Sequence, residues 1–213
     1  KPDGTAGIDT ELLLGEPVTV LERKGGWAWV KAGIDAYVGY LPETALAAVP
    51  AAPTHWITAP RTFLYSEPDM KRPPVEALSM GSRITATGEA ETRGTPYLLT
   101  DRGAVIARHA APVDVAVTGD YVAVAARFLE TPYLWGGRSG FGLDCSGLVQ
   151  LSMMMAGRAA MRDSDMQMAS LGAEIGGDAL RRGDLVFWKG HVAIMEDADT
   201  MIHANGYTMS VAR

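Results

Sequence analysis

The chain has 213 residues, of which 47% are hydrophobic and 21% are charged, and its formal net charge is −6. These values fit a globular protein of one large domain or two to three small ones. The acidic balance and the lack of a Lys/Arg cluster exclude a basic nucleic-acid-binding surface.

The single cysteine excludes an internal disulfide framework and a cysteine-rich zinc module. It is compatible with a reducing compartment, and a cytoplasmic location is favoured over a periplasmic or secreted one. No window holds the roughly 18 apolar residues of a membrane helix, so we expect no membrane partner. The oligomeric state stays open.

Residues 10–50 are a run of short β-type segments. Residues 17–21 lead to a glycine turn, residues 27–31 follow with alternating aromatic side chains, and residues 37–42 close the run. Short strands separated by turns are typical of a small barrel. We therefore predict an all-β domain over residues 1–50.

Residues 55–112 repeat this order at an offset of about 65 residues. Residues 83–86 match the first strand, residues 96–100 match the aromatic strand and residues 103–107 match the closing strand. We predict a second copy of the module over residues 51–113. The alternative, two unrelated β-meanders that look alike, stays open.

Residues 114–213 have a different pattern, which predicts an α+β domain. Apolar side chains recur at helical spacing over residues 120–130 and 145–156. The β-type segments that follow are residues 185–188, 191–195 and 200–203.

The chemistry centres on Cys145, which starts the second predicted helix, and on two of the four histidines. A helix N-terminus favours a thiolate, and a histidine can act as base and then as acid. His191 begins one strand and His203 ends the next, so the two side chains should be neighbours. Asn205 is a second candidate for orienting the base, but Asn205-Gly206 also predicts a turn, and His203 is preferred.

Five motifs occur in an order that resembles the NlpC-type cell-wall cysteine peptidases. The likeness covers the chain from about residue 120 to its end. The motifs are Tyr133-Leu134-Trp135-Gly136-Gly137, Asp144-Cys145-Ser146-Gly147-Leu148, Gly183-Asp184-Leu185-Val186-Phe187, His191-Val192 and Ile202-His203-Ala204.

The resemblance implies a papain-like fold that cleaves peptidoglycan stem peptides without a cofactor. It implies Cys145 as nucleophile, His191 as base and His203 as the orienting group. The main-chain amide of Cys145, with Tyr133, would face the oxyanion. The segment Gly39-Tyr40-Leu41-Pro42 resembles the last strand of bacterial SH3-like domains. The expected architecture is an α+β papain-like catalytic domain preceded by two small all-β SH3-like barrels.

A narrower resemblance is to members with two SH3-like domains, which are γ-D-glutamyl-L-diamino acid endopeptidases. They act on murein stem peptides (L-Ala-γ-D-Glu-diamino acid) that have a free N-terminal L-Ala. By this likeness Glu67, in Tyr65-Ser66-Glu67-Pro68, binds the substrate ammonium. The other substrate-binding positions implied are Asp144, Ser146, Ser164 and, from the second SH3-like domain, Tyr97.

Two other functions stay open. The protein could be a peptidoglycan-binding SH3-like module with a weak or vestigial hydrolase domain. Alternatively, Cys145, His191 and His203 are all possible zinc ligands, although thiol–imidazole catalysis uses the same set without a metal. We predict no metal.

Overall fold

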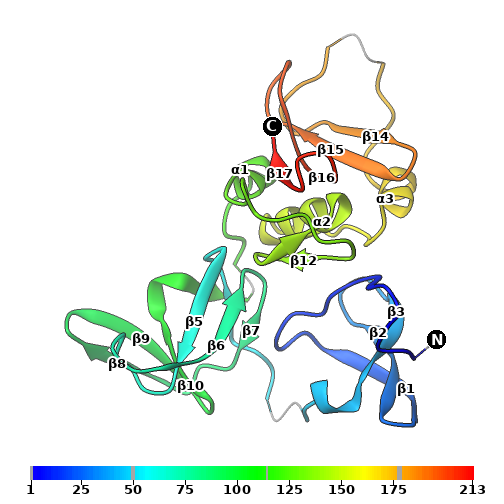
Figure 1. Ribbon diagram of the computed structural model, residues 1–213. Coiled ribbons are helices and arrows are strands. Elements are labelled where there is room, and N and C mark those ends of the chain that lie inside the picture. The colour runs from blue at the N-terminus through cyan, green and yellow to red at the C-terminus, as the bar shows by residue number, and fades with distance from the viewer. Residues whose placement is uncertain (1, 49–50, 114, 177–178) are drawn as a thin grey trace. The chain divides into compact units, whose positions relative to one another are not determined.

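The structure is a computed structural model that describes residues 2–48, 51–113, 115–176 and 179–213 (Figure 1). The described residues divide into two compact units. The first contains Lys1–Gly7 and Leu12–Val115, and the second contains Ile8–Glu11 and Ala116–Arg213. Within the described residues, no helix is both long enough and apolar enough to cross a membrane.

The first unit begins with a three-stranded antiparallel sheet, β1 (Val18–Lys24), β2 (Trp27–Ala32) and β3 (Val38–Pro42), in that order. Every second residue of β2 is buried, as expected for a strand with one face on a core. On its other face the Trp29 and Tyr40 rings lie 4.6 Å apart. The predicted β-rich segment is confirmed.

The remainder of the first unit has two further sheets. One sheet has the strand order β6-β5-β10-β9-β8, and the other sheet has the order β11-β4-β7. The core of this part of the unit is aliphatic. The bounds are β4 (His55–Ile57), β5 (Arg61–Tyr65), β6 (Pro74–Ser79), β7 (Arg83–Ile84), β8 (Gly88–Thr92), β9 (Thr95–Thr100), β10 (Gly103–Ile106) and β11 (Ala110–Pro112). A 3-10 turn follows β10 (Ala107–His109), as one follows β3 (Glu43–Ala45).

The predicted strand over residues 83–86 is wrong in its extent. β7 ends at Ile84 and pairs with β4, whereas β8 pairs with β9. Between them the amide of Ala86 donates to the Thr54 hydroxyl and the amide of Thr87 donates to the Leu99 carbonyl. The predicted strand therefore ends two residues early, and the chain passes from one sheet to the other before β8 begins.

The second unit has three α-helices and a four-stranded sheet of order β14-β15-β16-β17. Helix α2 packs against β15 and β16 (Figure 1). The bounds are α1 (Tyr121–Ala126), α2 (Cys145–Met155), α3 (Ser164–Ser170), β14 (Leu185–Trp188), β15 (His191–Met195), β16 (Met201–Asn205) and β17 (Ser210–Ala212), with a small hairpin β12 (Arg138–Ser139) and β13 (Gly142–Leu143).

The first helix is shorter than predicted. Asp120 caps α1 by accepting hydrogen bonds from the amides of Val122 and Ala123. The helix ends at Ala126, because the chain then turns towards β17, where the amide of Glu130 donates to the Val211 carbonyl. Helix α2 and strands β14 and β15 match their predicted positions.

Candidate active site

Cys145 is the first residue of α2, and its neighbours explain why a helix starts there. The Asp144 side chain caps the helix by accepting from the amide of Gly147 at 2.7 Å. A Cβ at Gly147 would lie 2.2 Å from the Gly137 carbonyl oxygen, so a larger residue would push the two backbones apart. The thiol thus sits at the positive end of a well-capped helix.

The Cys145 side chain is buried, and burial raises the pKa of its thiol. The backbone amide of Val192 opposes this by donating to the sulfur, as do amides at the start of α2, while the charge of Asp144 raises the pKa of Cys145 further. The contact with Val192 places the sulfur at the beginning of β15, one residue from His191.

The two histidines lie side by side as predicted, although the predicted end of the second strand is wrong, because β16 continues past His203 to Asn205. His191 Nε2 is 2.8 Å from His203 Nδ1, and the rings are 5.1 Å apart at their centroids. Burial lowers the pKa of both imidazoles, and the charge of His203 lowers the pKa of His191 further. Since Nε2 of His191 is engaged, its Nδ1 is the nitrogen left for proton transfer.

Arg162 is a buried partner of this site that the sequence did not reveal. Its guanidinium donates to both oxygens of Asp144, at 3.0 and 2.6 Å, and to the Ser146 hydroxyl at 2.9 Å. It also donates through Nε to the Thr10 hydroxyl, so this arginine joins the segment Ile8–Glu11 to the rest of the second unit, to which the segment belongs. The neighbours of Arg162 in the sequence, Met161 and Asp163, give no signal of this role.

Tyr133 approaches the same site from the loop before β12. Its amide donates to the Met209 carbonyl at 2.8 Å, which ties this loop to the β16–β17 turn. Burial raises the pKa of Tyr133, and the negative charges of Cys145 and Asp144 add to the effect. The hydroxyl therefore stays protonated and can donate a hydrogen bond to a developing oxyanion.

Comparison with known proteins gives a consistent result. The family model described as the bacterial dipeptidyl-peptidase Sh3 domain matches residues 1–46, and the NlpC/P60 family model matches residues 130–213. The gamma-D-glutamyl-L-lysine dipeptidyl-peptidase of Bacillus cereus is 29% identical over 92% of this chain and 67% of its own length. The probable endopeptidase NlpC of Escherichia coli is 34% identical over 46% of this chain and 72% of its own length. The chain belongs to the NlpC/P60 family.

A solved structure supports the membership. The crystal structure of an NlpC/P60 family protein from Bacillus cereus aligns with a TM-score of 0.80 at 28% identity, covering 96% of this chain and 75% of that chain. The protein is thus a cysteine peptidase that has a papain-like NlpC/P60 domain and an N-terminal SH3-like domain.

The remaining predicted site residues of this NlpC/P60 peptidase are placed as follows. Ser164 begins α3, and Gln167 of that helix donates to the Ser146 carbonyl at 3.0 Å. Glu67 belongs to the first unit, where its carboxylate is exposed and pairs with Arg72 at 3.0 Å. Tyr97, also in the first unit, is only 1% exposed, and its hydroxyl has no hydrogen-bond partner within the part of the chain that is described.

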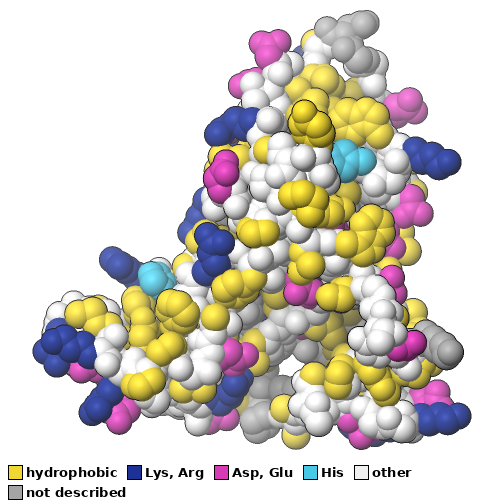
Figure 2. Space-filling model, in the orientation of Figure 1, with side chains coloured by type: hydrophobic (Ala, Val, Ile, Leu, Met, Phe, Trp, Pro, Cys, Tyr) yellow, Lys and Arg dark blue, Asp and Glu magenta, His cyan; other side chains and the backbone are white. Residues whose placement is uncertain are grey.

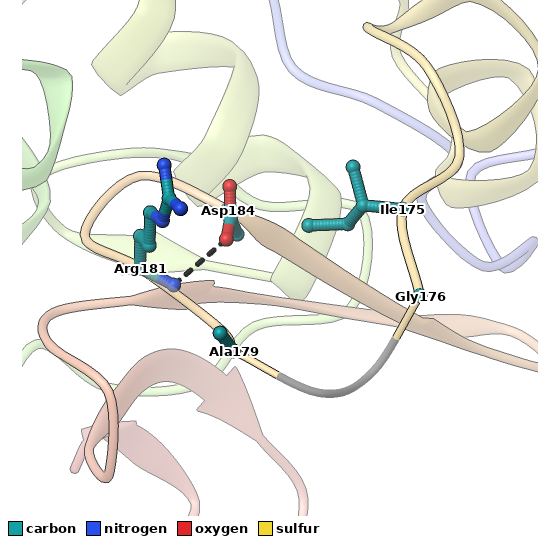
Figure 3. A pocket seen from close by; sticks show the side chains of 5 residues that line it. All are labelled: Ile175, Gly176, Ala179, Arg181 and Asp184. Atoms are coloured by element: carbon teal, nitrogen blue, oxygen red, sulfur yellow. Dashed lines mark hydrogen bonds between the residues drawn. The ribbon is translucent and has the colours of Figure 1, made fainter.

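Two surface hollows of the second unit lie elsewhere. One is lined by Ile175, Gly176, Ala179, Arg181 and Asp184 (Figure 3), and in it the Arg181 amide donates to Asp184 at 2.7 Å. The other surrounds the ion pair of Asp120 with Arg182. None of the proposed catalytic side chains lines either hollow, so neither is the active site.

Hydrophobic side chains are mixed with charged ones on the visible surface (Figure 2). In the second unit the exposed aromatic side chains include Trp135, which is 70% exposed, and Tyr207, which is 97% exposed. Each lies two residues from a residue of the site, Tyr133 or Asn205. The ring of Trp188, which is 48% exposed, lies 5.6 Å from the His191 ring at their centroids, so apolar contact area is available next to that histidine.

Proposed function

We propose that this peptidase hydrolyses the γ-D-glutamyl–diamino acid bond of murein stem peptides that have a free N-terminal L-Ala. The observation that carries the proposal is the His191–His203 pair beside a buried thiol at a helix N-terminus. Relatives over nearly the whole chain support the bond specificity, because those of Bacillus cereus and Bacillus subtilis are named gamma-D-glutamyl-L-lysine dipeptidyl-peptidases.

In the proposed reaction the Cys145 sulfur attacks the γ-carbonyl carbon of D-Glu, and the thiol proton passes to His191. The amide of Cys145 and the Tyr133 hydroxyl stabilise the oxyanion. As the C–N bond breaks, His191 gives the proton to the departing amine and a thioester remains. Water then attacks the thioester, releases the acid and restores the thiol.

Asp144, Ser146 and Ser164 are proposed to contact the peptide. Asp144 is already neutralised by Arg162, so a substrate group that binds Asp144 must share it with that guanidinium. Ammonium recognition would then fall mainly to Glu67, whose partner Arg72 is exposed. Tyr97 would need its buried hydroxyl to become accessible before it could contact substrate.

We further propose that residues 51–113 are a second SH3-like copy and that the enzyme recycles wall peptides in the cytoplasm. The order strand, strand, 3-10 turn occurs in both β-rich segments, as β2-β3-turn and as β9-β10-turn. The second of the two SH3-like domains would present Glu67 to the substrate. If catalysis were vestigial, the same modules would act as a peptidoglycan-binding protein.

The deciding experiment is incubation with L-Ala-γ-D-Glu-meso-diaminopimelate, and with the L-Lys analogue, followed by detection of L-Ala-D-Glu. We expect release of this dipeptide by the native protein and none by Cys145→Ala. Absence of product while Cys145 is reduced would contradict the proposed function. Elemental analysis of the active protein tests the zinc alternative. If that alternative holds, preparations with more bound zinc are more active.

A further inference from the structure

Asn205 makes two kinds of contact, and together they fix the orientation of its amide. Its Oδ1 accepts from the backbone amides of Tyr207 at 2.9 Å and Thr208 at 2.8 Å. This end of the side chain must be the carbonyl, because both neighbours are donors. The NH₂ end therefore points at His203, with Nδ2 at 3.2 Å from Nε2.

An NH₂ group can only donate, so Nε2 of His203 must accept and cannot carry a proton. A neutral His203 then holds its proton on Nδ1, which lies 2.8 Å from His191 Nε2. That nitrogen of His191 in turn becomes an acceptor. A neutral His191 consequently carries its proton on Nδ1, the nitrogen left for Cys145.

We propose that Asn205 is a positioning residue that fixes the tautomers of His203 and His191, so that the resting site holds a neutral imidazole beside Cys145 and not a thiolate–imidazolium pair. The thiol proton can pass to Nδ1 of His191 only after both imidazoles change tautomer. The proton of His191 must move from Nδ1 to Nε2, and the proton of His203 must move from Nδ1 to Nε2. The Asn205 NH₂ would then face a proton and lose its acceptor. This inference rests on the proposed roles of Cys145 and His191.

The surrounding charges agree with this resting state. The titratable and charged groups around the site are Cys145 and Asp144 at the start of α2, with Arg162 and Tyr133 beside them. Burial raises the pKa of the thiol and lowers the pKa of both histidines, so each group favours its neutral form.

Asn205→Asp separates this role from the structural role of the turn. A carboxylate still accepts from the amides of Tyr207 and Thr208, but it replaces the donor that faces His203 by an acceptor. His203 would then hold its proton on Nε2 and accept from His191 through Nδ1. His191 could carry both protons, and an imidazolium beside Cys145 lowers the pKa of the thiol.

A neighbouring turn provides the matched control. Asp197, in the β15–β16 hairpin, accepts from the amides of Asp199 at 2.9 Å and Thr200 at 2.8 Å. The further charge that acts on it is Arg182, with no histidine involved. The exchange Asp197→Asn therefore makes the reverse substitution in an equivalent turn of the same sheet.

The first test is the ¹⁵N imidazole spectrum of the native protein at a pH where both histidines are neutral. We expect His203 to be protonated on Nδ1 in the native protein and on Nε2 in Asn205→Asp. A native protein with the proton on Nε2 would overturn the inference. The spectrum of the native protein alone decides between these outcomes, so the test holds even if the substituted protein fails to fold.

The second test is the pH dependence of Cys145 alkylation by iodoacetamide. We expect the midpoint to fall by about one pH unit or more in Asn205→Asp and to stay unchanged in Asp197→Asn. An unchanged midpoint in Asn205→Asp would overturn the inference. Neither test uses a stem peptide, so failure to cleave the peptide would count against the proposed function alone.

Discussion

Arg162 and Asp144 form a buried ion pair with two hydrogen bonds, directly beside the cysteine at the start of α2. The Nη2–Oδ2 distance is 2.6 Å, and the side chains are 1% and 12% exposed, respectively. Arg162 lowers the pKa of the nearby Tyr133, against the effect of Asp144. The pair thus allows an acidic helix cap next to the thiol without an unbalanced charge.

We expect Arg162→Met to destabilise the second unit by about 3–5 kcal/mol, because it leaves the Asp144 carboxylate buried without its counter-charge. The double variant with Asp144→Asn should recover part of this loss, since Asn keeps the cap and removes the charge. Urea unfolding followed by the helical circular-dichroism signal measures this, because all described α-helices belong to the second unit.

The exposed pair of Arg182 and Asp120 gives a matched control, with side chains 46% and 44% exposed. Arg182→Met should change the free energy of unfolding by no more than about 1 kcal/mol. If the two arginine variants lost the same stability, the buried pair would have no special structural role.

Glu67→Gln tests recognition of the substrate's free amine. We expect KM for the free L-Ala peptide to rise at least about tenfold, because a carboxylate that pairs with an ammonium typically contributes more than a neutral amide does. The N-acetylated peptide, which has no ammonium, should be hydrolysed equally by both proteins. Initial-rate kinetics on the two peptides measure this difference.

Glu76→Gln is the control for that substitution. Glu76 is also a carboxylate of the first unit that pairs with an arginine, Arg102. Its KM for the free peptide should match that of the native protein. A Glu67→Gln enzyme with native kinetics on the free peptide would remove Glu67 from the substrate site.

The local parts of the site could be predicted from the sequence because they depend on spacing along the chain. Cys145 starts a helix and His191 starts a strand, as the apolar periodicity indicates. Arg162 could not be predicted, because its role depends on a tertiary contact with Asp144 and not on its neighbours in sequence.

Asn205 shows a different limit. The sequence offers a turn and an orienting role as alternatives, but the structure shows that the one side-chain amide contacts both the turn amides and His203. The two contacts use opposite ends of the side chain, which no sequence pattern reveals. The early end of β7 has a similar cause, since Thr85 and Ala86 continue the β-type sequence while the Ala86 amide donates to the Thr54 side chain.

Tyr133→Phe tests the proposed oxyanion donor. Removal of one such donor typically lowers kcat on the order of 100-fold, while KM should change little because the contact forms with the oxyanion. Steady-state kinetics on the stem peptide measure both constants. A variant with a raised KM and a native kcat would place the hydroxyl in ground-state binding instead.

The histidine pair should make the stability of the second unit depend on pH. Burial lowers the pKa of His191 and His203, so between the folded and the unfolded pKa the unfolded chain binds more protons. The contribution of the two histidines to the free energy of unfolding is therefore fully present above the unfolded pKa of about 6.5. It is lost as the pH falls below that value. Urea unfolding at about pH 7.5 and about pH 5.5, followed by the helical signal, should give a lower midpoint at the lower pH.

His203→Gln should reduce that difference, since one buried imidazole and its effect on the pKa of His191 are removed. His109, whose pKa burial also lowers, belongs to the first unit, so His109→Gln should leave the pH dependence of the helical signal unchanged. Equal pH dependence in the native protein and in His203→Gln would show that the acid sensitivity of the second unit arises from groups other than the histidine pair.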